Sequence, residues 1–84
     1  MSSSAPTALD VRPLSPDRKS MTVLAAFDRL EAGGSFVLVD DRDPGALRTR
    51  MEDERPGQGR WVYLQNGPHV WHVRIERANP SGSA

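Results

Sequence analysis

Side chains that could bind a ligand follow two apolar runs of the chain, "ALDV" (8–11) and "SFVLVDD" (35–41). Guanidinium groups bind carboxylates and phosphates through paired hydrogen bonds, and free N–H groups at helix N-termini also favour anions. If both runs are parallel strands, the groups that follow them meet at one edge of the sheet. This edge is therefore a candidate rim for binding a small anion or a metal ion. Its candidate residues are Arg12, Ser15, Asp40, Asp41, Arg42 and Asp43.

The same residues also have a structural interpretation. Ser15 and Asp43 are residue types that cap helices, and carboxylates commonly pair with nearby arginines at a surface. On this alternative, Asp40 and Asp41 pair with Arg12 and Arg42. A nucleophilic role for Ser15 would require an adjacent base, which the sequence does not mark. No catalytic residue is therefore predicted, and the chain is expected not to be an enzyme.

Two histidines offer an alternative metal site. His69 and His72, together with Asp41, form a ligand set that suits a divalent transition ion. Residues three apart on a strand point to opposite faces. The two imidazoles can therefore converge only if His69 precedes the strand. No cofactor is predicted from this arrangement.

Three aromatic residues suggest either a core or a stacking surface. Trp71 alternates with Val73 and Ile75, so all three are predicted to face the core, and Trp61 and Tyr63 share a face that can join it. The alternative is an RNA-binding sheet face, on which exposed aromatic rings stack on bases. The net charge of zero disfavours a nucleic-acid partner, because phosphate neutralisation drives such binding.

The first helix is predicted to begin at a serine–proline pair. Ser15 suits the N-cap, and Pro16 suits the first helical position, where its missing N–H costs nothing. Apolar residues then recur at helical spacing, and Gly33 with Gly34 is predicted to end the helix. The apolar stripe consists of Val23, Leu24, Phe27 and Leu30.

The second half of the chain predicts a short helix followed by two strands. Asp43–Pro44 repeats the pattern of a cap followed by proline, and residues 55–57 end the helix. Strands are predicted at 60–64 and 70–76, joined by the asparagine–glycine turn at 66–68.

The resulting order, β-α-β-α-β-β, predicts an α+β fold. Its simplest form is a two-layer α/β sandwich, in which two helices pack on one face of a four-stranded mixed sheet. We expect a single domain over residues 8–77. The small polar segments 1–7 and 78–84 are predicted to be disordered tails.

Composition narrows the classes of function. The chain has 11 basic and 11 acidic residues and no cysteine, which excludes disulfides, thiolate catalysis and cysteine-based metal centres. The longest apolar stretches are about five residues, against the ~20 that cross a bilayer. The expectation is a bacterial-type, cytoplasmic domain with no membrane partner. The open sheet edges permit a monomer or a weak dimer.

The order of motifs resembles the TusA/SirA-like superfamily and, more closely, the family called domain of unknown function 2249. The resemblance covers about residues 9–76. It is carried by "LDVR" (9–12), "DRDP" (41–44), "RPG" (55–57) and four residues of "WHVRI" (71–75), namely Trp71, Val73, Arg74 and Ile75.

The resemblance implies a TusA-like fold and a context rather than an activity. TusA-like proteins are sulfur carriers with a cysteine–proline pair at the first helix, where this chain has Ser15–Pro16. Because serine cannot carry a persulfide, sulfur transfer is not expected. Members of the nearer family often have histidine where this chain has Arg42. They also occur beside hemerythrin-like domains, with links to nitrogen-oxide and respiratory metabolism. The leading prediction is therefore an accessory or adaptor domain with a hemerythrin-like or respiratory redox partner.

Overall fold

The computed structural model describes residues 7–78 and has the predicted element order, β-α-β-α-β-β. The predicted tails, 1–7 and 78–84, lie outside the described residues except for Thr7, which is the first residue of β1, and Ala78. Within the described residues, no helix is long and apolar enough to cross a membrane. The elements are β1 (Thr7–Asp10), α1 (Pro16–Asp28), β2 (Ser35–Asp40), α2 (Gly45–Glu54), β3 (Gly59–Asn66) and β4 (Trp71–Arg77).

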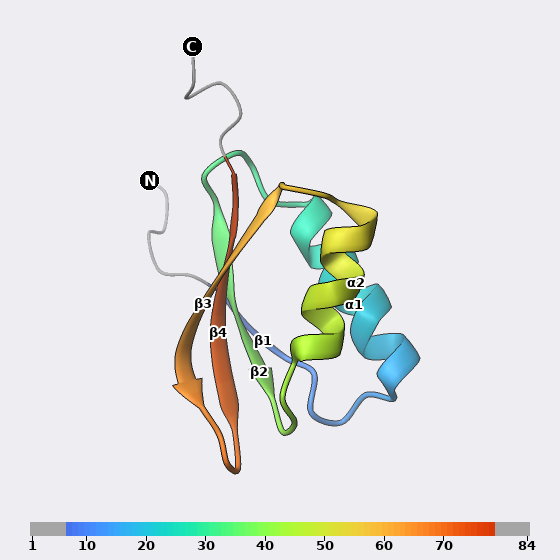
Figure 1. Ribbon diagram of the computed structural model, residues 1–84, viewed down its shortest axis with the longest axis vertical. Helices are drawn as coiled ribbons and strands as arrows, with labels where there is room; N and C mark the ends of the chain where they lie inside the picture. Colours follow the sequence, from blue (N-terminus) through green and yellow to red (C-terminus); the bar gives the residue numbers. More distant parts are fainter. Residues whose placement is uncertain (1–6, 79–84) are drawn as a thin grey trace.

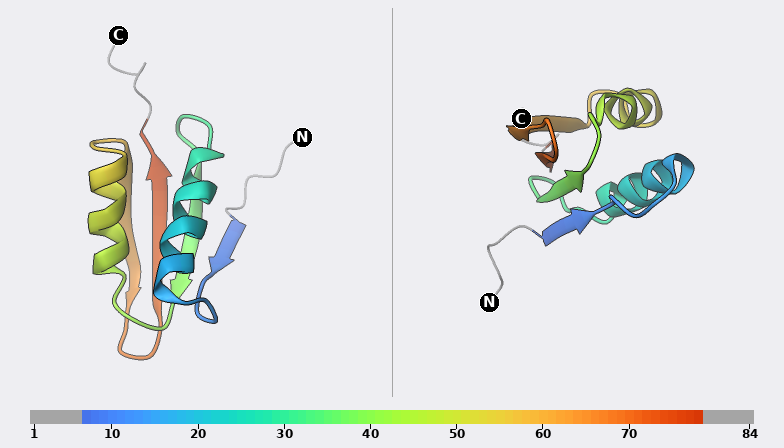
Figure 2. Two further views of the ribbon diagram at one scale, coloured as in Figure 1. Left: turned by 90° about the vertical axis from the view of Figure 1, so that its right-hand side faces the viewer. Right: turned by 90° about the horizontal axis from the view of Figure 1, so that it is seen from below.

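The four strands form one mixed sheet in the order β1-β2-β4-β3. β1 and β2 are parallel, and β4 runs antiparallel between β2 and β3. Both helices lie on the same face of the sheet, so the predicted two-layer architecture is confirmed (Figures 1 and 2). Because β1 and β2 are parallel, their carboxyl ends meet at one edge, and the loops into α1 and α2 leave from it.

The core lies between the helices and the sheet. Val23 and Phe27 from α1 and Leu47 and Met51 from α2 are buried, as their helical spacing predicts. Alternate residues of the strands meet them, because successive strand residues point to opposite faces. The sheet contributes Phe36, Leu38, Val73 and Ile75 to this core, and Trp61 and Tyr63 pack against it.

The predicted end of α1 at Gly33 and Gly34 is wrong, because the helix ends at Asp28. The Arg77 guanidinium, from the far end of the chain, donates hydrogen bonds to the carbonyl oxygens of Phe27, Asp28 and Leu30 at 3.1–3.4 Å. It also lies 5.4 Å from the centre of the Phe27 ring. These tertiary contacts satisfy carbonyls that a longer helix would use. Gly33 instead adopts a φ of 83° in the turn before β2.

The prediction that Trp71 belongs to the core is also wrong. Trp71 is on the helix-facing side of β4, as the alternation predicts, but it is only half-buried and lies outside the core cluster. It stands at the end of the β3–β4 hairpin, which extends beyond the helices (Figure 1). Its indole lies against Gly67 and donates a hydrogen bond of 2.9 Å to Asn66 Oδ1.

Candidate functional site

A groove of about 340 Å³ opens at the edge where β1 and β2 end. The loop from β1 to α1 forms one wall, and the loop from β2 to α2, with the first turn of α2, forms the other. Five of the six predicted rim residues line it, and Ser15 is the exception. The lining residues are Arg12, Leu14, Pro16, Lys19, Ser20, Asp40, Asp41, Arg42, Asp43, Ala46 and Leu47.

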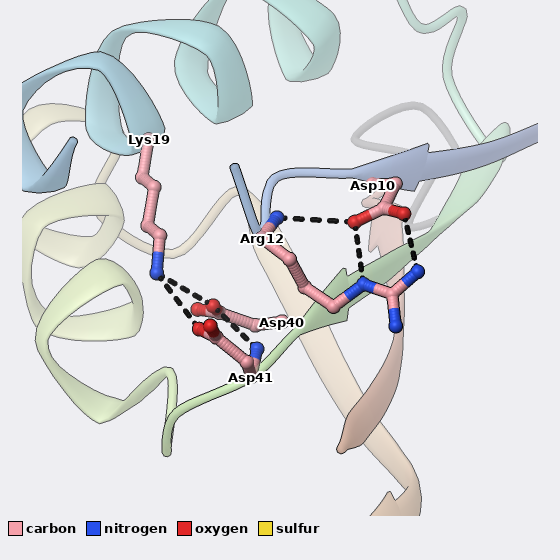
Figure 3. Close-up of polar contacts among 5 residues, drawn as sticks. All are labelled: Asp10, Arg12, Lys19, Asp40 and Asp41. Carbon is pink, nitrogen blue, oxygen red and sulfur yellow. Dashed lines mark hydrogen bonds and ion pairs between the residues drawn. The ribbon is translucent and has the colours of Figure 1, made fainter. Parts of the chain in front are cut away.

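The floor of the groove is a buried ion pair (Figure 3). Lys19 Nζ from α1 lies 2.8 Å from Asp40 Oδ1 at the end of β2 and 3.3 Å from Asp41 Oδ1. The side chains of Lys19 and Asp40 are 10% and 3% exposed, whereas that of Asp41 is 48% exposed. Asp40 Oδ1 also accepts the backbone N–H of Asp41 at 2.8 Å. The pair therefore ties α1 to the loop that begins α2.

The contacts of Lys19 shift the pKa values of Lys19 and Asp41. Burial by itself would lower the pKa of Lys19, but the hydrogen bonds and negative charges of Asp40 and Asp41 outweigh burial and raise that pKa. The hydrogen bond from Lys19 lowers the pKa of Asp41, against a smaller opposing effect of desolvation. Both shifts favour the charged forms of Lys19 and Asp41.

Arg12 is held by a neighbour on its own strand end. Its Nε and Nη2 donate to the two carboxylate oxygens of Asp10 at 2.9 and 2.7 Å, and its backbone N–H donates to Asp10 Oδ1 at 3.0 Å (Figure 3). These hydrogen bonds lower the pKa of Asp10 from 3.8 to about 2 and raise that of Arg12. Arg12 nevertheless stays half-exposed at the mouth of the groove.

The structural interpretation predicted the wrong ion-pair partners for the two aspartates. Asp40 and Asp41 pair with Lys19 rather than with Arg12 and Arg42. Within residues 7–78, Arg42 takes part in none of the ion pairs, and it is exposed on the groove wall.

The helix starts agree with the prediction at α1 and differ by one residue at α2. Ser15 is the N-cap of α1, its Oγ accepts the backbone N–H of Arg18 at 3.4 Å, and Pro16 is the first helical residue. At α2 the N-cap is Pro44 rather than Asp43. Asp43 Oδ1 accepts the N–H of Gly45 at 3.0 Å, because the Asx-type turn it forms lies just before the helix.

Lys19 is the site residue that the sequence prediction missed. It precedes Val23 and Phe27 by four and eight residues, so it lies on the buried stripe of α1. A lysine on such a stripe requires a carboxylate partner, because a buried unpaired charge is costly. The sequence therefore marks Lys19 as a charged residue in an apolar register, but it does not show which carboxylate is the partner.

The proposed metal ligands are not brought together. Within the part of the chain that the structure describes, no group of three histidine or acidic side chains is placed to hold a metal ion. His72 pairs in register with Val39, whose side chain is on the face away from the helices. Asp41 is instead hydrogen-bonded to Lys19 on the helix side, and His69 lies in the β3–β4 turn.

The face of the sheet away from the helices is a second surface. Val37, Val39 and Val62 are half-buried there, beside an ion pair of 2.9 Å between Arg74 and Glu76. Trp61 and Tyr63 are on the opposite, helix-facing side, where they pack against the core as predicted. The aromatic face that RNA stacking requires is therefore not formed by these residues.

The groove combines an internally paired charged floor with exposed charged and aliphatic side chains. Its deepest charged groups, Lys19 and Asp40, are engaged with each other, and their rigid pairing fixes the two loops. The exposed groups at its mouth carry both signs of charge, and aliphatic side chains complete the lining. Such a site offers charge contacts and a small apolar surface to a ligand of matching size.

Comparison with known proteins assigns the chain to a family. No curated protein matches the chain, and no solved structure matches it. The model of one family, described as "Uncharacterized conserved protein (DUF2249)", matches residues 8–77, which is nearly all of the folded part. The observed element order is compatible with the TusA/SirA-like superfamily that the sequence resembles. The chain belongs to the DUF2249 family.

Proposed function

We propose that this domain is a non-catalytic accessory module that binds a small charged ligand in the groove at the ends of β1 and β2. The observation that carries the proposal is convergence. Arg12, Asp41 and Arg42 come from two loops separated by almost thirty residues, and all three are exposed on one groove. A ligand in the groove can therefore contact charged groups from both loops at once.

The buried ion pair supports the same function. A ligand site requires walls that hold their shape before the ligand arrives, because disorder in the free site costs affinity. Lys19 and Asp40 join the walls beneath the exposed groups. The absence of cysteine from the chain is consistent with binding and excludes sulfur carriage.

A titration followed by backbone amide NMR tests the proposal. The labelled protein would be titrated with inorganic phosphate, nitrite, acetate and a set of free amino acids. We expect saturable shifts confined to residues 12–20 and 40–47 for at least one probe. Arg42→Ala should weaken that binding, whereas Arg48→Ala, an exposed arginine on α2 outside the groove, should leave it unchanged.

Two results would contradict ligand binding at the groove. One is silence across the whole panel at millimolar concentrations. The other is a set of saturable shifts located elsewhere, for example around Val37 and Val62 on the far face of the sheet.

The second surface favours a second candidate function, an adaptor that contacts another protein. The helices leave one whole face of the sheet uncovered, and half-buried valines from β2 and β3 lie on it. The family resemblance suggests a hemerythrin-like or respiratory redox protein as the partner. Affinity purification from the native host would compare the wild type with Val37→Glu and Arg42→Ala. The adaptor function predicts that Val37→Glu loses a partner that Arg42→Ala retains, and equal recovery with both variants argues against this face.

A further inference from the structure

The charges that line the groove balance. Three cationic side chains, Arg12, Lys19 and Arg42, face three acidic ones. The acidic residues are Asp40, Asp41 and Asp43. A groove for a phosphate or another anion would show a positive excess, and a groove for a cation would show a negative one. Neither excess is present.

From this balance, and resting on the proposed function of the groove, we infer that its ligand is a small aliphatic zwitterion with the chemistry of a free amino acid. Such a molecule carries a carboxylate and an ammonium group a few bonds apart and has no net charge. Its carboxylate can contact a cationic side chain of the lining while its ammonium group contacts an acidic one, so neither end of the ligand faces a like charge.

The groups left free by the internal contacts match the two ends of a zwitterion. Arg42 takes part in no ion pair within residues 7–78, so its guanidinium is available to a ligand carboxylate through paired hydrogen bonds. Asp41 and Asp43 each use Oδ1 internally, for Lys19 and for the N–H of Gly45. The second oxygen of each exposed carboxylate is thus available to an ammonium group, since an ionised carboxylate accepts at both oxygens.

The uncharged lining and the size of the groove indicate the rest of the ligand. The apolar side chains are aliphatic, and none is aromatic. A volume of about 340 Å³ lies near the lower end of small-molecule sites, which span about 300–1,000 Å³. The four apolar lining residues are Leu14, Pro16, Ala46 and Leu47.

Three probes with one aliphatic group separate the possibilities. L-leucine carries both charges, 4-methylpentanoate lacks the ammonium group, and 3-methylbutylamine lacks the carboxylate. Amide NMR titrations, with calorimetry where affinity permits, would measure the Kd of each probe. Alanine, valine and methionine would extend the series. We expect at least one amino acid to bind at the groove about tenfold more tightly than its two single-charge analogues.

Variants assign each end of the ligand to its partner. Arg42→Ala should lower the affinity for the amino acid to that for the amine and leave the affinity for the amine unchanged. Asp43→Asn keeps the oxygen that accepts the Gly45 N–H. It should lower the affinities for the amino acid and the amine but leave the affinity for the carboxylate probe unchanged. Arg48→Ala is the matched control and should change none of the three affinities. Loss of all three affinities in Arg42→Ala would instead indicate a collapsed groove and would overturn the assignment.

The three probes distinguish a wrong ligand class from the absence of any binding at the groove. If 4-methylpentanoate binds as tightly as leucine, the groove is an anion site, and if 3-methylbutylamine does, it is a cation site. In both cases the zwitterion is refuted while the ligand-binding function stands. If no amino acid binds but phosphate or nitrite does, the result is the same. Silence to every probe refutes both.

Discussion

Replacing Lys19 by methionine should destabilise the fold strongly, because it leaves Asp40 charged and buried. Methionine preserves most of the side-chain volume, so the lost ion pair is the main change. Asp40 is 2% exposed and would retain only the N–H of Asp41 as a hydrogen-bond donor. Breaking one side of a buried ion pair typically costs about 3–5 kcal/mol. We expect the lower value, about 3 kcal/mol, since the Lys19 side chain is 10% exposed and lines the groove.

That loss is large on the scale of this domain. Typical stabilities of roughly 0.05–0.15 kcal/mol per residue give about 4–11 kcal/mol for some 70 residues. A loss of about 3 kcal/mol should lower the Tm by about 12–24 °C. Thermal and urea unfolding followed by circular dichroism would measure both quantities at pH 7.

The double variant Lys19→Met/Asp40→Asn tests the cause. Asparagine removes the charge and keeps an oxygen for the Asp41 N–H, so no buried charge remains unpaired, and much of the stability should return. Arg12→Met breaks the exposed pair with Asp10 and should leave the Tm nearly unchanged. A loss of less than about 1 kcal/mol for Lys19→Met, or additive effects in the double variant, would refute the reasoning and show that Asp40 is effectively solvated.

Three further perturbations address the core, the end of α1 and pH. Phe27→Ala should lower the free energy of unfolding by about 3–5 kcal/mol, and Trp71→Ala by clearly less, because Phe27 is fully buried and Trp71 is not. Equal losses in urea unfolding would show that Trp71 belongs to the core. Arg77→Ala should cost about 1.5–3 kcal/mol and increase amide hydrogen exchange at the end of α1, since its guanidinium satisfies three carbonyls there; unchanged exchange would contradict that role. Acid should lower the Tm only slightly through Asp10, because its pair with Arg12 is exposed. The pKa of Asp10 is lowered to about 2, so its small contribution is complete above the unfolded value of 3.8 and is lost as the pH falls toward 2. Asp10→Asn should diminish this small drop in a series of Tm measurements, and a large drop that Asp10→Asn abolishes would contradict the screening argument.

The polar partners of the site could not be read from the pattern alone. The sequence places Arg12 and the residues 40–43 at one edge of the sheet, because both follow parallel strands. It indicates Arg12 and Arg42 as partners of the aspartates, because they lie at the same edge, whereas Lys19 competes from α1, 21 residues before Asp40. The packing of α1 across β2 settles the competition by carrying Lys19 to 2.8 Å from Asp40.

The same contrast holds for the fold. Alternation in "VWHVRIE" and the stripe of Val23 and Phe27 predict the element order and the helix-facing residues, because backbone periodicity is a local property of the chain. The end of α1 and the exposure of Trp71 depend on Arg77 and on how far the helices extend over the sheet. Contacts between residues fifty positions apart have no local pattern. Local chemistry therefore specified the elements and the edge at which the groove forms, whereas packing selected the partners of its charges.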